Sequence, residues 1–500
     1  MTFLSRILGL VRDVVIANIL GAQAATDVFL VAQKIPNFLR RLFGEGAFSQ
    51  AFIPVLSEYQ QQRSYEELRH LVSRVAGTLG GVLFIVTVFG VIFSPIIGGL
   101  FGFGFVQKGE TYKFLLVSDL IKVTFPYIFF ISLTAFAGSI LNSLGRFAIP
   151  AFAPVLLNLC IIFAAIWISP MLSEPVEALA WAIFVAGVLQ LLLHLPFLWR
   201  LGYLVKPQWG WHDSGVRRIL KLMAPAMFGV SVSQVNLLLD TVIASFLVTG
   251  SITWLYLSDR MLEFPLGLFG IAIATVILPS LSRAVADKKH EQLSSLLNWA
   301  LHMVFLIGLP AAVGLFILAE PVMLAVFQHG EYTLNHAYQS SLSLQAYIVG
   351  LLSFMFIKVL ATGYFSQQDT KTPVKIGIIA LVVNMVFNLL LFKPFGHVGL
   401  AAATTISATV NAGLLWLGLI KNNTLIMDSR WVWWGVRGFI SAGLMVAVIL
   451  LTIEPIENLR ASNLFDRGVE LALMIGLGGF VYIVSLFGLG FRLRDIKSHH

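Results

Sequence analysis

Charged residues and cysteines are both scarce in this 500-residue chain. Only 12% of its residues are charged, against roughly 25% in soluble domains. The one cysteine, Cys160, lies in an apolar run, so no disulfide or thiolate metal cluster can form within the chain, and redox chemistry is not expected. The sequence also lacks the H-E-x-x-H, nucleophile-elbow and Walker motifs, which argues against an enzyme.

What the chain has instead is apolar residues, which make up 58% of it and form long runs. The hydrocarbon core of a bilayer is about 30 Å thick and needs roughly 20 residues of helix. Windows of that length predict fourteen transmembrane helices, the first of them retained rather than cleaved as a signal peptide. We therefore expect an all-α polytopic membrane protein.

The net charge of +8 is better explained by topology than by a nucleic-acid partner. Lys and Arg recur in alternate connections between the apolar runs, as at Arg63 and Arg69 and again at Lys288 and Lys289. The positive-inside rule places these connections, and with them both termini, in the cytoplasm. The contrast is weakened by five cations on the opposite side: Lys108, Lys113, Lys393, Arg460 and Arg467.

Short strings recur at a nearly constant offset. AFIPVLSEY (51–59) returns as VILPSLSRA (276–284), which aligns Pro54 with Pro279, and DVVIANIL (13–20) returns as DTVIASFL (240–247). The order of the matches predicts two six-helix lobes in parallel orientation, as in some transporters. We expect an N-terminal lobe at 1–205, a second lobe at 206–421, and two extra transmembrane helices at 422–500.

The first apolar segment carries three charges, Arg6, Arg12 and Asp13. Helical spacing puts Ser5, Gly9 and Arg12 on one face with Asp13 beside it, and such a polar face suits a water-filled cavity. Two structural explanations stay open. The side chains of Arg6 and Arg12 can extend so that their methylene groups stay in the apolar layer while the guanidinium groups reach the cytoplasmic interface. Alternatively, Arg12 can form a structural salt bridge with Asp13.

Two more polar clusters interrupt apolar segments. The first places Lys34, Asn37, Arg40 and Arg41 in helical register at the end of the second span, where positive-inside bias alone explains one or two of the cations. The second is DRMLEFPLG (259–267), in which Asp259, Arg260 and Glu263 interrupt the eighth span. Arg260 and Glu263 are spaced i, i+3, which allows either a structural salt bridge or an arginine held in place to bind an anion.

These clusters belong to the strings SRILGLVRD, IPNFLRRLFGEGAFSQAFIPVLSEY and DRMLEFPLGLFGIAIATVILPSLS, which resemble the MurJ (MviN) family of lipid II flippases. The resemblance covers essentially the whole chain, although family members usually have further residues before Met1. It implies the MOP-exporter fold, with two lobes around a central cavity, in the bacterial inner membrane. The implied substrate is lipid II, the undecaprenyl-diphosphate-linked disaccharide-pentapeptide used for peptidoglycan synthesis, and the implied partners are membrane lipids and the peptidoglycan synthesis machinery.

The resemblance also implies roles for the polar residues. A guanidinium group binds diphosphate oxygens in a bidentate manner and stays charged in a membrane cavity. The residues expected to bind the headgroup are Arg12, Arg260, Arg40, Arg6, Asn37 and Lys34. The residues expected to orient these cations or balance their charge are Asp13, Asp27, Glu45, Asp259 and Glu263. The last two helices are expected to shield the polyprenyl tail.

Ion coupling is the remaining implied feature, and no other cofactor is expected. Asp240, Asn384, Asn388 and Thr404 offer the oxygen ligands of a small hard cation and resemble the sodium site of some family members. Asn384 and Asn388 could instead hydrogen-bond between helices, and proton coupling is the alternative to sodium. Two other functions were weighed, a polysaccharide-lipid flippase of the same superfamily and a multidrug or cation antiporter, and the antiporter should have an acidic cavity.

Overall fold

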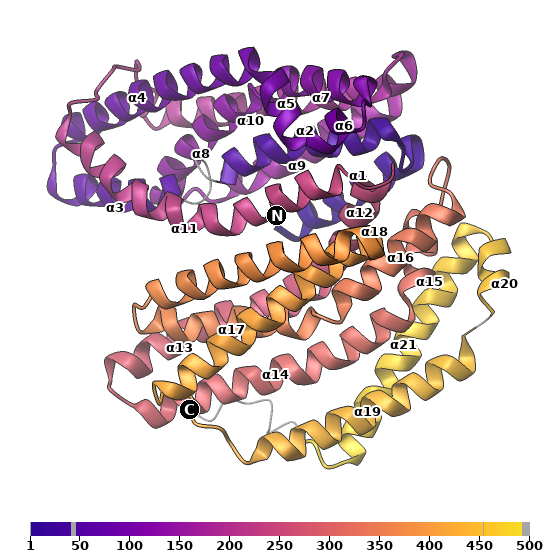
Figure 1. Cartoon of the computed structure of the whole chain (residues 1–500). Helices are drawn as coiled ribbons and strands as arrows, with labels where there is room; N and C mark the ends of the chain where they lie inside the picture. The colour runs from indigo at the N-terminus through magenta and orange to yellow at the C-terminus, as the bar shows by residue number, and fades with distance from the viewer. Residues whose placement is uncertain (1, 42–46, 454, 493–500) are drawn as a thin grey trace. The chain divides into compact units, whose positions relative to one another are not determined.

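The computed structural model describes residues 2–41, 47–453 and 455–492 (Figure 1). All regular secondary structure within these ranges is helical. The chain divides into two compact units, Met1–Thr253 (unit 1) and Trp254–His500 (unit 2). The predicted lobe boundary at residues 205 and 206 falls earlier than this division, because α11 (Ser214–Ala244) packs along α3 (Ala47–Gln62) in unit 1. The three predicted domains stay a prediction.

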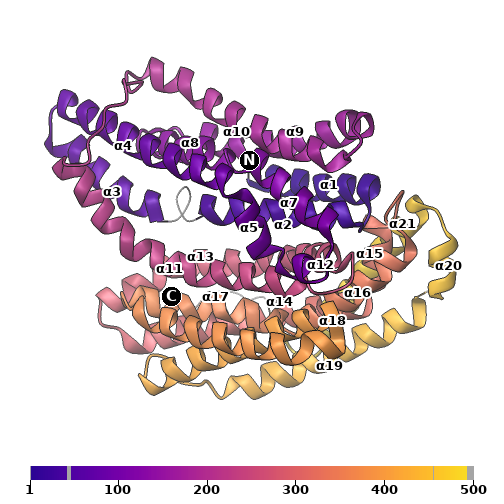
Figure 2. The same ribbon diagram turned by 45° about the horizontal axis from the view of Figure 1, so that its top comes forward.

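Unit 1 is organised around α8 and α10. Helix α10 lies beside α8 and α9, and α8 also contacts α3 and α4, as Figure 2 shows for α4, α8 and α10. Buried aromatic rings join α3 to α8, with the centroids of Phe52 and Phe136 5.1 Å apart. Besides α3 and α11, the helices of this unit are α1 (Thr2–Leu20), α2 (Ala24–Leu39), α4 (Tyr65–Ile92), α5 (Ser94–Phe101), α6 (Phe103–Gln107), α7 (Thr111–Thr124), α8 (Tyr127–Ser143), α9 (Ala148–Phe163), η2 (Ala164–Ile168), η3 (Ser169–Met171) and α10 (Pro175–Arg200).

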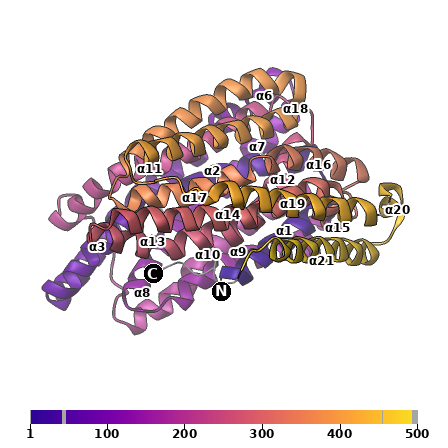
Figure 3. The same cartoon turned by 90° about the horizontal axis from the view of Figure 1, so that it is seen from below.

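Unit 2 contains the long helices of the C-terminal half. Helix α14 contacts α17 and α19, and α19 lies along α21, as Figure 3 shows for α14, α19 and α21. The Tyr482 hydroxyl on α21 donates to the Leu306 carbonyl oxygen on α14 at 2.8 Å, which fixes the last helix to this unit. The helices are α12 (Ser251–Pro265, which begins in unit 1), η4 (Leu266–Gly270), α13 (Ile271–Ala286), α14 (His290–Ile317), α15 (Ala319–Phe327), α16 (Leu334–Ile348), α17 (Leu351–Ser366), α18 (Lys371–Lys421), α19 (Arg430–Thr452), α20 (Ile456–Ala461) and α21 (Leu464–Gly488).

Nine helices of the described residues are long and apolar enough to cross a membrane, or ten if α16 and α17, which meet at 43°, form one bent span. This confirms a polytopic helical protein of the membrane type, but not the predicted count of fourteen. Helix α1 carries three charges in 19 residues. Helix α18, with 51 residues, is counted as one candidate span. A kink divides this helix at Gly396, where φ is 56°, a conformation that glycine adopts readily.

A π-helical segment, η4, separates α12 from α13. It begins directly after Pro265, whose ring nitrogen carries no N–H to continue the α-helical hydrogen bonding. Such segments are frequent at functional sites. Arg260 and Glu263 of the eighth predicted span lie in the two turns before it.

Candidate functional site

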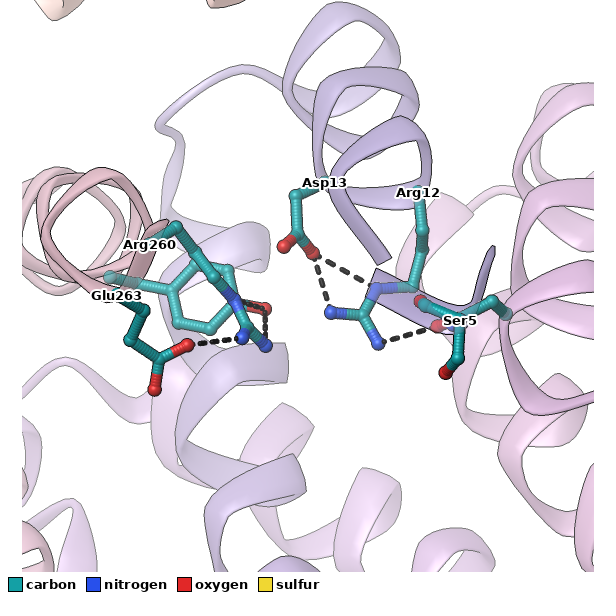
Figure 4. Close-up of polar contacts among 7 residues, drawn as sticks. Ser5, Arg12, Asp13, Arg260 and Glu263 are labelled. Carbon is teal, nitrogen blue, oxygen red and sulfur yellow. Dashed lines mark hydrogen bonds and ion pairs between the residues drawn. The ribbon is translucent and has the colours of Figure 1, made fainter. Parts of the chain in front are cut away.

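Arg12 is held inside unit 1 by hydrogen bonds to Asp13 and Asn158 (Figure 4). Its Nε and Nη2 donate to Asp13 Oδ1 at 2.9 and 2.7 Å, and its Nη1 donates to Asn158 Oδ1 on α9 at 3.1 Å. Asn158 in turn donates to the Ser5 carbonyl oxygen at 3.1 Å. The pair that the sequence allowed is therefore present. Sequence reasoning missed Asn158, whose signal was a single amide in the apolar run of α9.

The two arginines of α1 differ in environment. Arg12 is only 7% exposed and Asp13 1%, so removing one of the two residues would leave the other buried without this ion pair. Arg6, six residues earlier on the same helix, is exposed. An exposed position is compatible with an arginine that reaches the interface, and its role in binding a headgroup stays a prediction.

The cationic cluster at the end of α2 is tied to α11. The Lys34 ammonium group donates to Thr241 Oγ1 at 2.8 Å, and Arg41 Nη1 donates to Gln234 Oε1 at 3.3 Å. Lys34, Asn37 and Arg40 are half-buried, whereas Arg41 is exposed. Glu45, expected to balance these cations, lies outside the described residues.

Arg260 in unit 2 is more accessible than Arg12. Its Nη1 donates to Glu263 Oε2 at 2.9 Å, the predicted i, i+3 pair (Figure 4). Nε and Nη2 donate to the Tyr256 hydroxyl at 3.3 and 3.1 Å, with the guanidinium carbon 5.1 Å from the ring centroid. The Arg260 side chain is 36% exposed, so a solvent-borne anion can reach it. Tyr256, one helical turn before Arg260, was missed, and the half-buried Asp259 precedes Arg260.

Asp27 caps the N-terminal end of α12. This carboxylate, 2% exposed, accepts hydrogen bonds from the Gly250 N–H at 2.6 Å, the Thr253 N–H at 2.9 Å and the Thr253 hydroxyl at 2.7 Å. A negative charge at a helix N-terminus is favoured by the unpaired N–H groups and the helix dipole. These three bonds are those of a helix cap, and the predicted role of Asp27 in orienting or balancing the headgroup-binding cations stays a prediction.

The turn between α11 and α12 is also held by α6 and the start of α7. The Gly104 N–H donates to Ser245 Oγ at 2.9 Å, and the buried Lys113 donates to Thr249 Oγ1 at 2.8 Å. Lys108, which precedes α7, donates to the Leu247 carbonyl oxygen at 2.6 Å. In the sequence, Lys108 and Lys113 stood out only as cations in connections that the positive-inside rule places outside the cytoplasm. That departure from the rule was the available signal that they have structural partners.

Of the candidate sodium ligands, three lie together on α18. Asn388 Nδ2 donates to Asn384 Oδ1 at 2.7 Å, and Asn384 Nδ2 donates to Thr404 Oγ1 at 3.3 Å. Both asparagines are fully buried. This donor set suits a small hard cation in its chemistry, and its bonds are equally those of the interhelical alternative. Asp240 belongs to the other unit, so the four-residue site stays a prediction.

Comparison with known proteins identifies the family. A sequence model described as "Lipid II flippase MurJ" matches residues 16–465. The chain is 50% identical to the probable lipid II flippase MurJ of Haemophilus influenzae, covering 100% of this chain and 99% of that protein. It is 49% identical to the corresponding protein of Vibrio cholerae, covering 100% and 96%.

Comparison with solved structures agrees with the sequence comparison. The structure titled lipid II flippase MurJ, inward closed conformation, is similar with a TM-score of 0.82 and 28% identity, covering 97% of this chain and 96% of that one. An inward-facing multidrug transporter of the MATE family in the MOP superfamily shares the fold at a TM-score of 0.71 and 16% identity, covering 85% and 95%. The chain belongs to the lipid II flippase MurJ family.

Proposed function

We propose that this protein is a lipid II flippase of the bacterial inner membrane, which moves the lipid-linked peptidoglycan precursor from the cytoplasmic to the periplasmic leaflet. The observation that carries the proposal is the match to lipid II flippases at up to 50% identity over the whole chain. The family consists of transporters, and we propose no catalytic activity for this member. The lipid II that it delivers to the periplasmic leaflet is used in peptidoglycan synthesis, and the enzymes of that synthesis are its proposed partners.

The headgroup is bound by guanidinium groups in a transport cavity with alternating access. The accessible Arg260, oriented by Glu263 and Tyr256, is suited to first contact with a diphosphate. Arg12, whose guanidinium group is oriented by Asp13 and Asn158, contributes a second cation to the diphosphate. The proposed ligands are Arg12, Arg260, Arg40, Arg6, Asn37 and Lys34. Asp259 joins Asp13 and Glu263 in balancing their charge.

The finer topology is part of the same proposal. Fourteen transmembrane helices form two lobes, both termini are cytoplasmic, and α19 and α21 shield the polyprenyl tail. Transport is coupled to sodium through Asp240, Asn384, Asn388 and Thr404, or to protons. Membership of the MurJ family favours lipid II over the other substrates of MOP-type transporters, namely polysaccharide lipids and drugs.

The test is complementation of a strain depleted of its essential lipid II flippase, combined with an assay for lipid II on the outer leaflet. The wild-type chain should restore growth and outer-leaflet lipid II. Arg260→Ala should fail at normal expression, and Arg260→Lys should rescue in part because a point charge replaces a bidentate group. Exposed Lys289, replaced by Ala, is the matched control and should complement. A wild-type chain that does not complement would overturn the proposal.

A further inference from the structure

The connection from α10 to α11 contains residues 203–213, which form neither helix nor strand and are here called the strap. Its backbone is hydrogen-bonded to α4 rather than left in solvent. The Gln208 N–H donates to the Ser73 carbonyl oxygen at 3.0 Å, and the Gly210 N–H donates to Thr78 Oγ1 at 2.9 Å. The Ser73 hydroxyl donates to the Lys206 carbonyl oxygen at 2.5 Å. The strap is therefore a fixed surface element.

Two glycines of α4 make room for the strap. A Cβ on Gly77 would lie 2.2 Å from the Gln208 carbonyl oxygen, and a Cβ on Gly81 would lie 2.6 Å from Trp209 Cζ3. Residues four apart share a helix face. Such a glycine pair in a membrane helix commonly receives a second helix, and here it receives the strap.

The strap crosses α4 where that helix changes character. Before the glycines, α4 carries charged residues as far as Arg74. Beyond them it exposes large apolar side chains, with Phe84 60% and Phe89 56% exposed. In the proposed topology this change corresponds to the boundary between the water-facing and the lipid-facing part of α4, which places Trp209 at the membrane interface.

The exposed side of the strap combines indole rings with positive charge. Trp209 and Trp211 are 60% and 43% exposed, and their rings are nearly parallel with centroids 6.1 Å apart. Lys206 on the strap and Arg217 and Lys221 on the first turns of α11 are exposed. The adjacent acid, Asp213, is occupied by an ion pair with Arg74 and by two N–H groups at the start of α11. Tryptophan favours the interface, and clustered Lys and Arg attract anionic lipids.

We propose that the strap is a docking surface for the headgroups of anionic phospholipids in the cytoplasmic leaflet. The indole rings of Trp209 and Trp211 insert at the level of the headgroups, and Lys206 and Arg217 bind their phosphates. The inference rests on the proposed orientation, in which this connection is cytoplasmic, and not on the identity of the transported lipid. Because the strap joins α10 to α11, a bound lipid fixes the start of α11.

The test is lipid binding to the purified full chain in detergent, measured by native mass spectrometry with phosphatidylglycerol and phosphatidylcholine of equal acyl chains. Wild type should prefer phosphatidylglycerol. The double variant Lys206→Gln, Arg217→Gln should lose affinity for it roughly fivefold per charge removed, while affinity for phosphatidylcholine, whose headgroup carries no net charge, should fall much less. The matched control, Lys288→Gln with Lys289→Gln, removes two exposed charges elsewhere and should retain the preference.

A second pair of variants tests the aromatic part. Trp209→Ala with Trp211→Ala should weaken retention of both lipids, whereas Trp181→Ala, an equally exposed tryptophan near the opposite end of α10, should not. A wild type without lipid preference, or a control pair that loses as much as the strap pair, would overturn the inference. The measurement contains no lipid II, so a protein that complements but shows no preference keeps its proposed function and loses only the lipid surface.

Discussion

Replacing Asp27 by Asn should destabilise the protein, because the carboxylate caps α12 with three hydrogen bonds. Asn can keep one oxygen toward the Thr253 N–H and hydroxyl. Its amide then points two N–H donors at the Gly250 N–H, which loses its acceptor at a buried position. Hydrogen bonds to charged groups contribute about 1.5 to 3 kcal/mol, and an unsatisfied buried donor costs about 1 to 3 kcal/mol. We therefore expect a loss of about 2 to 4 kcal/mol in the free energy of unfolding.

Thermal unfolding of the purified protein, read by size-exclusion chromatography after heating, measures this effect. Thr253→Val is the control, since it removes only the hydroxyl bond to the carboxylate, leaves no N–H donor without an acceptor, and should cost about 1.5 to 3 kcal/mol. The double variant should cost less than the sum, because both changes remove the same contact. If Asp27→Asn unfolds at the wild-type temperature yet fails to complement, Asp27 acts on the transported lipid or its cations and the capping argument is refuted.

Three further outcomes follow from the geometry. Arg12→Ala should lower thermal stability by about 3 to 5 kcal/mol by leaving Asp13 buried without its cation, and adding Asp13→Ala should recover most of the loss; a double variant no more stable than the single one contradicts this. Gly77→Val should displace the strap from the Gln208 contact and increase its cleavage in limited proteolysis, whereas cleavage at the wild-type rate would mean that the groove is not needed. Asp240→Asn should remove the difference between sodium and potassium in lipid II binding, and a wild type indifferent to the two salts would exclude the sodium site.

The helical membrane architecture was predictable because composition and run length decide it. The number of spans was not, since it depends on where helices break. Gly396 divides α18 through a backbone conformation that the sequence does not display, and η4 continues α12 into α13 without ending the helix.

The site was predictable where contacts are local. Arg12 with Asp13 and Arg260 with Glu263 are neighbours along the helix, so spacing identified both pairs. The partners that sequence reasoning missed are distant, since Asn158 lies 146 residues from Arg12 and Thr253 lies 226 residues from Asp27. Such contacts arise only when helices pack, and no residue pattern within one segment encodes them.

The π-helical turn at Leu266–Gly270 makes this part of the chain tolerant of a deletion that a regular helix would not accept. Its hydrogen bonds run from residue i to residue i+5, so the turn contains about one residue more than a turn of α-helix. Removing one residue there would let the hydrogen bonds close as a regular α-helix, and the side chains of α13 would keep nearly the same direction relative to α12, so the buried Ile277 and Leu281 would stay in the interior. The same deletion inside α13, before Ile277, would instead turn every later side chain by about 100° around the helix axis. A single-codon deletion is therefore expected to be accepted within the π-helical turn and rejected in the α-helix that follows it.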